Sequence, residues 1–417
     1  MSEETKDIPK VPSDMETPKA LNYIEKLVAE LCPDGVEYVE LGGVTVIKRG
    51  KSLTKKNTLP GNIPVIAGGR SPAYYHSTSN RQGPVIVVAG SGAYAGYVSY
   101  WESDIYASDA FSVKPKDSDL TSIKYIYYFL SSQQNKLYRL QSGSGVPHVY
   151  PRDFNKLIIP FPPLEVQNAI VEILDKFTKL EAELEAELAA RRAQYEYYRN
   201  LLYENLIDQV PKLELGKFAT LNRGHGMPKS DFVETGVGAI HYGQIYTKYG
   251  FSANSTLAYV SEESARRLTK VSPGDLVVTN TSENINDVCK AVAWIGDEDI
   301  VTGGHSTVVT QHFQNPKYLS YYFSTDKFNF DKKKYAFGTK VIDVSPKNLA
   351  KIKIPLPPLA EQERIVKILD KFDVLVNDIS SGLPAEIEAR RKQYEYYRDR
   401  LLTFPRKFEP AEQAMQR

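Results

Sequence analysis

Basic side chains recur at matching places in two segments of this 417-residue chain, and their chemistry suits contact with a polyanion. Arg49-Gly50 in the first segment matches Arg223-Gly224 in the second. Because lysine and arginine neutralise phosphate oxygens, and both segments are basic there, the pattern favours phosphate contact over an ordinary solvated turn. The candidate phosphate-contacting residues are Lys48, Arg49, Lys51, Lys55 and Lys56 in the first segment and Arg223, His225 and Lys229 in the second.

Other polar residues carry donors and acceptors that suit the edges of nucleic-acid bases. Gly68-Gly-Arg70 and Tyr242-Gly-Gln244 occupy comparable positions, and arginine pairs well with guanine as glutamine does with adenine. Gly143-Ser-Gly145 and Gly338-Thr-Lys340 are a further matching pair. The candidates for base contact are therefore Arg70, Tyr242 and Gln244, with Ser144, His148, Thr339 and Lys340 as a weaker group. Base contact by any single one of them stays open.

A glycine-rich stretch, Gly90–Gly96, follows an apolar run and could suggest a cofactor loop. Such a loop should open a helix, but the residues after it, Tyr97–Trp101, are typical of a strand. The equivalent place in the second segment, Thr279–Asn284, has no glycine. We therefore expect no cofactor here. The stretch is interpreted as a plain hairpin or as a loop that approaches DNA.

No other pattern indicates catalysis or metal binding. The six histidines never take metal-ligand spacing, and no Ser-His-Asp set can be assembled. Cys32 and Cys289 lie far apart, so neither a disulfide framework nor a zinc site is expected. The first residues lack the features of a signal peptide, and no apolar run reaches the length of a membrane span. We expect a cytoplasmic protein without catalytic residues, bound metal or cofactor.

The net charge of +1 hides an uneven distribution. Residues 36–159 hold 14 Lys+Arg against 8 Asp+Glu, and residues 212–354 hold 18 against 14. These two segments therefore carry +6 and +4, and the rest of the chain carries −9. The pattern favours polyanion binding at two places and protein contacts elsewhere, with chance variation in surface charge as the alternative.

Two long blocks of sequence occur twice. Pro160–Phe177 returns as Pro355–Phe372 with 12 of 18 residues identical, and both copies share Pro-Pro-Leu-x-x-Gln and Ile-Leu-Asp-Lys-Phe. A second block, Gln-Tyr-Glu-Tyr-Tyr-Arg, ends at Arg199 and again at Arg398. A repeat of this length predicts two equivalent units related by approximate symmetry.

The repeated blocks predict long helices. Apolar residues from Leu164 to Leu202 follow a three-four spacing, and the prolines before them suit a helix start. No glycine or proline interrupts this run before Pro211, so one helix of some 40 to 45 residues is expected. The second copy contains Ser380-Ser-Gly-Leu-Pro384, which predicts a broken helix. We expect the two copies to pair antiparallel, with their tyrosine-bearing segments side by side.

The two segments between the helices are rich in residues typical of strands and turns. Similar short stretches of sequence occur in both segments, in the same order. Pro84–Val88 resembles Asp275–Val278, and Tyr125–Phe129 resembles Tyr318–Tyr322. The predicted fold is α+β, with two α/β domains separated by two long antiparallel helices in a pseudo-two-fold, near-circular arrangement. The N-terminal helix and the C-terminal tail should then lie near each other.

These residues resemble the specificity subunit of type I restriction-modification systems, over nearly the whole chain. The repeated Pro-Pro-Leu-x-x-Gln, Ile-Leu-Asp-Lys-Phe and Gln-Tyr-Glu-Tyr-Tyr-Arg blocks carry the resemblance. It implies an N-terminal helical segment at 1–35, target recognition domains at 36–159 and 212–354, and conserved helical regions at 160–211 and 355–417, the last including the C-terminal tail. Each recognition domain would read one half of a bipartite, asymmetric sequence in double-stranded DNA.

The resemblance also implies partners that carry the chemistry. Two methyltransferase subunits would dock on the helices, which act as a spacer, and endonuclease/translocase subunits would join them. S-adenosylmethionine, ATP and Mg are then expected on those partners and not on this chain. Tyr195, Tyr198, Tyr394 and Tyr397 are candidates for partner contact, although packing between helices is the favoured interpretation. A self-contained methyltransferase or nuclease, and a coiled-coil adaptor without nucleic acid, are the alternatives.

Overall fold

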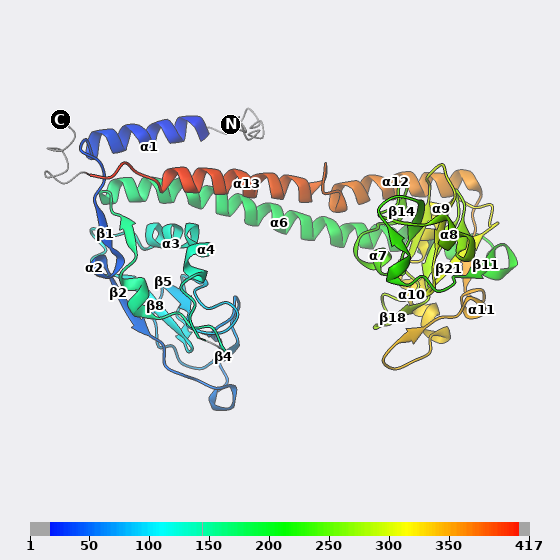
Figure 1. Cartoon of the computed structure of the whole chain (residues 1–417), viewed down its shortest axis with the longest axis horizontal. Coiled ribbons are helices and arrows are strands. Elements are labelled where there is room, and N and C mark those ends of the chain that lie inside the picture. Colours follow the sequence, from blue (N-terminus) through cyan, green and yellow to red (C-terminus); the bar gives the residue numbers. More distant parts are fainter. Residues whose placement is uncertain (1–16, 144, 408–417) are drawn as a thin grey trace. The chain divides into compact units, whose positions relative to one another are not determined.

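The computed structural model describes residues 17–143 and 145–407 (Figure 1). The chain forms two compact units. The first unit comprises the residues up to Glu185 and those from Glu386 onward, and the second unit comprises Ala186–Ala385. None of the helices in the described part of the chain combines the length and the apolar composition of a membrane span.

The first unit is built on a four-stranded antiparallel sheet and a three-stranded sheet. The order of the larger sheet is β2 (Thr45–Arg49), β8 (Ala110–Pro115), β5 (Val85–Ala89), β6 (Val98–Trp101). The smaller sheet is ordered β4 (Tyr74–His76), β3 (Ile63–Ile66), β7 (Tyr106–Ala107), and β1 (Tyr38–Glu40) pairs with β9 (Ile158–Pro160). Its helices are α1 (Thr17–Leu31), α2 (Leu41–Val44), η1 (Lys55–Asn57), α3 (Ile123–Ser132), α4 (Gln134–Tyr138) and α5 (Pro151–Asn155).

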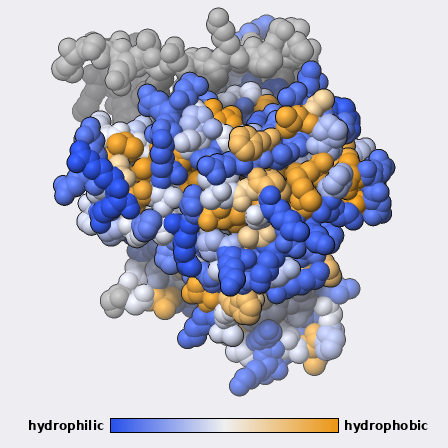
Figure 2. Space-filling model, turned by 90° about the vertical axis from the view of Figure 1, so that its right-hand side faces the viewer, coloured by the Kyte–Doolittle hydropathy of each residue, from blue (hydrophilic) through white to orange (hydrophobic). Residues whose placement is uncertain are grey.

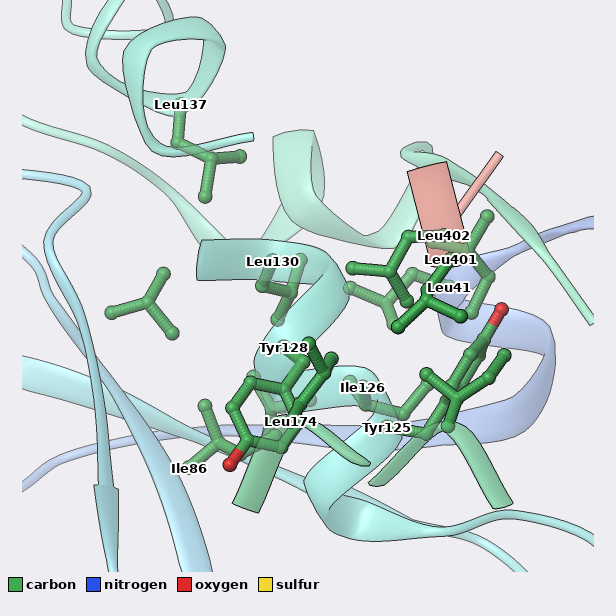
Figure 3. Packing of buried hydrophobic residues seen from close by; sticks show 14 of the residues in the cluster. Leu41, Ile86, Tyr125, Ile126, Tyr128, Leu130, Leu137, Leu174, Leu401 and Leu402 are labelled. Atoms are coloured by element: carbon green, nitrogen blue, oxygen red, sulfur yellow. The ribbon is translucent and has the colours of Figure 1, made fainter. Parts of the chain in front are cut away.

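Strand β5 explains why this unit has two apolar clusters. All five of its residues are buried, as expected for a central strand covered on both faces. Ile86 and Val88 belong to the large core beneath the helices, while Val85 and Val87 belong to a smaller cluster with Ile66. Figure 3 shows the large core, where Tyr125 and Leu130 of α3 lie among leucines from distant parts of the chain.

The second unit repeats this architecture with additional strands. One five-stranded sheet is ordered β11 (Thr220–Arg223), β21 (Ser306–Thr310), β17 (Leu276–Thr279), β19 (Ala291–Trp294), β14 (Ser252–Ala253). The other is ordered β12 (Phe232–Val233), β15 (Ala258–Val260), β13 (Val237–Ile240), β20 (Ile300–Thr302), β16 (Thr269–Val271). Two further pairs are β10 (Lys212–Glu214) with β23 (Lys353–Pro355) and β18 (Thr281–Ser282) with β22 (Ile342–Asp343).

Short helices complete the second unit. They are η2 (Leu215–Lys217), η3 (Lys229–Asp231), α7 (Tyr242–Thr247), α8 (Glu262–Arg267), α9 (Pro316–Tyr322), α10 (Asp326–Lys332), η4 (Lys333–Tyr335) and α11 (Pro346–Leu349).

On the face of the molecule shown in Figure 2, hydrophobic residues form several areas separated by hydrophilic ones. Scattered exposed apolar residues of this kind are ordinary on a protein surface.

The two units share one topology. The order β2-β8-β5-β6 in the first unit corresponds to β11-β21-β17-β19 in the second. In the smaller sheets, β3 pairs antiparallel with β4 and parallel with β7, as β13 does with β15 and β20. The predicted matches of Pro84–Val88 with Asp275–Val278 and of Tyr125–Phe129 with Tyr318–Tyr322 therefore lie on equivalent strands and helices.

The long helices follow the prediction of one continuous and one broken element. Helix α6 (Leu164–Ile207) runs for 44 residues without interruption, whereas the second copy consists of α12 (Leu359–Asn377) and α13 (Leu383–Leu401). Asp378 stabilises the break by accepting hydrogen bonds from the backbone and hydroxyl of Ser380. Gly382 is required there, because an added Cβ would lie 2.4 Å from the carbonyl oxygen of Val374.

The repeated glutamine ties each long helix to its own unit. Gln167 is fully buried, accepts a hydrogen bond from the Ser122 amide (2.9 Å) and donates to the carbonyls of Leu120 (3.1 Å) and Pro162 (2.8 Å). Gln362 is equally buried, and it accepts from the Asn315 amide (3.0 Å) and donates to Pro357 (2.9 Å) and Gln314 (2.7 Å).

The repeated aspartate has an equivalent role. Asp175 accepts hydrogen bonds from Lys124 (2.8 Å) and Tyr128 (2.5 Å) of α3. Asp370 accepts from Tyr321 (2.7 Å) and pairs with Lys317 (2.5 Å) of α9. These contacts give a structural reason for two of the residues that the two copies share.

The helices pair antiparallel within each unit, and the aromatic contacts cross between the repeats. Phe177 of the first copy packs against Tyr394 and Tyr397 of the second, with ring centroids 6.2 and 5.6 Å apart. Phe372 of the second copy packs in the same way against the tyrosine block of the first, at 6.2 Å from Tyr195 and 5.8 Å from Tyr198.

The expectation that the two tyrosine-bearing segments lie side by side is therefore wrong. Residues 195–198 belong to the second unit and residues 394–397 to the first. Antiparallel pairing is the reason, because it sets the start of one copy against the end of the other. Each tyrosine block consequently meets a phenylalanine and not its own counterpart.

Helix α1 lies beside the end of α13, as expected for the N-terminal helix and the C-terminal segment (Figure 1). Arg400 pairs with Glu25 at 2.6 Å, and the Lys407 amide donates to the carbonyl of Val36 (2.9 Å). The predicted tail beyond residue 407 lies outside the described residues.

Candidate nucleic-acid interface

Three loops of the first unit meet at the end of β5. Ser91, in the loop after β5, forms a β-bridge with His148, which also bridges Ser142. The Gly92 amide donates to the carbonyl of Pro147 at 3.0 Å. Gly68 is close as well, because a Cβ added there would lie 2.3 Å from the carbonyl oxygen of Ser91. The backbone thus holds the loops around residues 68, 91 and 148 together.

The residue before β8 completes this arrangement. The Gly90 amide donates to the backbone carbonyl of Asp109 (3.0 Å), and the hydroxyl of Ser91 bonds to Oδ2 of its carboxylate. Asp109 is exposed although Ser91 is buried. The carboxylate is therefore fixed in place by a buried hydroxyl while it faces solvent.

Arginines and aromatic rings surround these loops. The Arg70 guanidinium lies 4.7 Å from the ring centroid of Tyr94, which belongs to the glycine-rich loop. Arg49, at the end of β2, lies 5.8 Å from the ring of Tyr150, and that ring stacks on His148 at 6.2 Å. Cation–π contacts of this kind hold a guanidinium without using its hydrogen-bond donors. The donors remain accessible to an anionic ligand.

The same place in the second unit has an equivalent arrangement. Thr281 follows β17 and pairs with Asp343 of β22, which also bridges Phe337. The Asn280 amide donates to the carbonyl of His305 (2.7 Å), and the hydroxyl of Thr281 lies 3.0 Å from Nδ1 of His305. These contacts match those that Gly90, Ser91 and Asp109 make in the first unit.

Further candidates gather around His305 and Asp343. The Tyr242 ring lies 5.0 Å from the ring of His305 and 4.5 Å from that of His241. Burial first, and then the nearby charges of His305 and Lys229, lower the pKa of His241 below its usual value. Arg223 reaches Asp343 at 3.5 Å.

We define two loop sites from these contacts. The first loop site consists of Arg49, Ser91, Asp109 and His148, and the second loop site consists of Arg223, Thr281, His305 and Asp343. Strand registers establish the equivalence, because Ala89 is opposite Ala110 in the first unit as Thr279 is opposite Ser306 in the second. The positions match one to one, but the side chains at most of them differ.

The structure brings only part of the predicted set into these sites. Arg49, His148 and Arg223 belong to the sites. Arg70 packs on Tyr94 beside the first site, and Tyr242 packs on His305 of the second. Thr339 and Lys340 are exposed in the turn between Phe337 and Asp343, whereas Ser144 lies outside the described residues. Gln244 uses its side-chain oxygen to cap α7 by accepting from the His241 amide (3.2 Å).

The remaining basic candidates are exposed on nearby segments. Lys48 lies on β2, and Lys51, Lys55 and Lys56 lie on the segment that follows it. Lys229 begins η3, and His225 lies 3.1 Å from the hydroxyl of Thr269 through its Nδ1. Their contact with a ligand stays a prediction.

Sequence reasoning missed five members of the two sites. Ser91, Asp109, Thr281, His305 and Asp343 were not among the candidates. The available signal was the alignment of the strands: one hydroxyl residue comes two positions after β5 and β17, and one polar residue comes just before β8 and β21.

The glycine-rich stretch contains Ser91 of the first loop site. It leads into β6, a strand and not the helix that a cofactor loop should open.

Within residues 17–143 and 145–407, no group of three or more His, Cys, Asp or Glu side chains is placed to hold a metal ion. Cys289 is buried, and burial raises the pKa of its thiol to about 12.

The four tyrosines predicted to contact a partner differ in exposure. Tyr195 and Tyr397 are buried against phenylalanines, and Tyr394 is half-buried, as the packing interpretation expected. Tyr198 is 38% exposed. Their neighbours Tyr197 and Tyr396 are 62% and 47% exposed and were not predicted.

Comparisons with known proteins agree with this duplicated architecture. The family model described as type I restriction modification DNA specificity domain matches the chain twice, at residues 33–190 and 211–389. The chain therefore belongs to the family of type I restriction-modification specificity subunits.

Individual relatives extend over most of the chain. It is 31% identical over 404 residues to the specificity subunit of the type I restriction enzyme EcoR124I/EcoR124II of Escherichia coli, covering 93% of this chain and 98% of the relative. It is 23% identical over 329 residues to the MjaVIII specificity subunit of Methanocaldococcus jannaschii, covering 74% and 76%. A crystal structure of the S subunit from M. genitalium has the same fold, with a TM-score of 0.54, 17% identity and coverage of 88% and 96%.

Proposed function

We propose that each unit reads one half of a bipartite, asymmetric sequence in double-stranded DNA. The observation that carries this proposal is the pair of equivalent loop sites with different side chains on one duplicated topology. A shared scaffold with differing loops suits two recognition tasks of the same kind but of different specificity. Arginines at the edge of each site supply positive charge for phosphates, and the polar side chains suit base edges.

The proposed role is recognition without catalysis. Two methyltransferase subunits dock on the helices, and endonuclease/translocase subunits join that complex. S-adenosylmethionine, ATP and Mg belong to those partners. Exposed tyrosines support one docking surface in each unit, because tyrosine is enriched at protein interfaces: Tyr396 lies in the first unit, and Tyr197 and Tyr198 lie in the second.

The helices set the gap between the two half-sites in this proposal. Helix α6 has 44 residues in one uninterrupted run, a length of about 66 Å at 1.5 Å per residue. Its glutamine and aspartate contacts fix one end to α3, which favours a rigid spacer. Changing the helix length should alter the gap and leave the letters of each half-site unchanged.

Methylome sequencing tests the proposal directly. Cells that carry this chain together with its partner subunits should show methylation at a sequence with two separated halves. Replacing residues 36–159 with another recognition domain should change one half and leave the other intact. A continuous, unsplit motif, or a change in both halves, would refute the assignment of one half to each unit.

Two measurements separate the alternatives. Purified chain alone should not transfer methyl groups to DNA, whereas a self-contained methyltransferase would. Affinity for duplex DNA should fall steeply as salt rises, because phosphate contacts release counterions. A coiled-coil adaptor without nucleic acid would show no such binding.

A further inference from the structure

The two loop sites exchange an acid and an imidazole between equivalent positions. Before β8 and β21 the side chain is Asp109 in the first unit and His305 in the second. In the hairpin that bridges the hydroxyl residue, it is His148 in the first unit and Asp343 in the second. Since the backbone contacts around these positions match, the difference between the sites is one of hydrogen-bonding chemistry.

Asp109 offers an acceptor to a ligand. The Ser91 hydroxyl bonds to Oδ2, and Oδ1 of this exposed residue accepts no hydrogen bond from the described part of the chain. An ionised carboxylate only accepts hydrogen bonds. In the major groove the base groups that donate are the exocyclic amino groups of cytosine and adenine.

His305 offers a donor from the same place. When the Thr281 hydroxyl donates to Nδ1, Nε2 carries the ring hydrogen. The ring is exposed and packs beside Tyr242, which limits its orientation. The major-groove groups that accept from it are N7 and O6 of guanine, N7 of adenine and O4 of thymine.

The backbone at His305 supports a functional role independently. Its φ of +67° is uncommon for a residue with a side chain, and such conformations cluster at functional sites. Glycine would adopt this conformation more readily, and Gly303 and Gly304 precede it directly. At this position the His305 side chain meets both Thr281 and Tyr242.

We propose that Asp109 and His305 are specificity-determining residues at equivalent base-reading positions. Asp109 accepts a hydrogen bond from the amino group of cytosine or adenine in one half-site. His305 donates to an acceptor-bearing base in the other. This inference rests on the proposed DNA recognition by each unit, and it adds which side chain reads a base and which chemistry that base presents.

Exchanging the two side chains tests the inference in the intact complex. Methylome sequencing of cells that carry Asp109→His with the partner subunits should show a changed preference at one position of one half-site, where guanine or thymine becomes accepted in place of cytosine or adenine alone. His305→Asp should change one position of the other half-site in the opposite sense. A bidentate base contact is worth roughly 5- to 150-fold in preference, so the single hydrogen bond proposed for each residue predicts a change near the lower end of this range.

The matched control is Asp119→His, the same substitution at another exposed aspartate of the first unit. It should leave the whole motif unchanged. If Asp109→His abolishes methylation, the isosteric Asp109→Asn and selection of randomised duplexes with the purified complex decide the matter. Acceptance of a further base at a single position supports the inference, and an unchanged preference overturns it.

The motif of the wild-type complex separates a failure of the proposed function from a failure of the roles of Asp109 and His305. If the wild-type complex methylates no bipartite sequence, the proposed function is wrong. If it does, and both exchanges leave every position of the motif as it was, only the roles of Asp109 and His305 are refuted.

Discussion

Replacing the buried glutamine at the start of α6 should destabilise the first unit strongly. Gln167→Met keeps a side chain of similar length but removes three hydrogen bonds. The Ser122 amide loses its acceptor and the buried Pro162 carbonyl loses its donor, while Leu120 is exposed enough for water to approach its carbonyl. At about 1–3 kcal/mol for each buried group left unpaired, the loss is about 2–6 kcal/mol.

Thermal unfolding followed by circular dichroism measures this loss. For a unit of this size, 2 kcal/mol lowers Tm by at least about 4 °C. Asn168→Met is the matched control, because Asn168 is the next residue and is exposed, and its substitution should cost no more than about 0.5 kcal/mol. Hydrogen exchange should also accelerate at the Ser122 amide.

The internal repeat supplies a second test of the same reasoning. Gln362→Met should destabilise the second unit by a similar amount, with Glu363→Met as its exposed control. A Gln167→Met protein that melts within 1 °C of the wild type would show that water or a shifted backbone satisfies these groups, and that the repeated glutamine does not hold α6 in place.

Three further results are expected. Phe177→Ala should lower the unfolding free energy by about 3–5 kcal/mol in chemical denaturation, whereas Tyr197→Ala, at a 62% exposed position, should change it by no more than about 0.5 kcal/mol. Burial lowers the pKa of His312 in the folded protein, so below about pH 6.5 the unfolded chain binds a proton at this residue more readily than the folded one. The folded protein therefore loses stability as the pH falls, and His312→Gln should reduce the fall in Tm between about pH 7 and 5. Gly338 has a φ of +113°, and an added Cβ would lie 1.9 Å from the carbonyl oxygen of Val341. Gly338→Ala should therefore distort this turn and weaken duplex binding roughly tenfold. Gly250→Ala, where an added Cβ would meet open space, should leave duplex binding unchanged.

The helical framework was predictable because its signals are local. Proline and glycine placement alone distinguished the continuous α6 from the break after Asn377. The apolar stripes also predicted that the two copies pack on each other, and the chain order favoured antiparallel pairing. Antiparallel pairing sets the end of one copy against the start of the other, so the expectation that the tyrosine blocks lie side by side was wrong. Each block packs against a phenylalanine of the other copy.

The loop sites were predictable only in part, for a physical reason. Arg49 and Arg223 were recognisable because a repeated Arg-Gly pair marks them in the sequence. Asp109 and His305 are single polar residues before strands, without any similarity to each other. Their equivalence depends on the pairing of β5 with β8 and of β17 with β21, which joins residues distant in sequence. Composition and motif spacing carry no information about that register.

The crossed aromatic contacts constrain how such a gene can change. Phe177 is packed by tyrosines encoded near the end of the gene, and Phe372 by tyrosines encoded in its middle. A substitution in one block therefore disturbs the packing of the other, so we expect the two copies of the helical segments to change together. The residues of the two loop sites take no part in these aromatic contacts, so a change in a loop site leaves the packing of the helices intact. Recombination that exchanges loops while keeping both helical segments from one parent leaves each aromatic cluster whole.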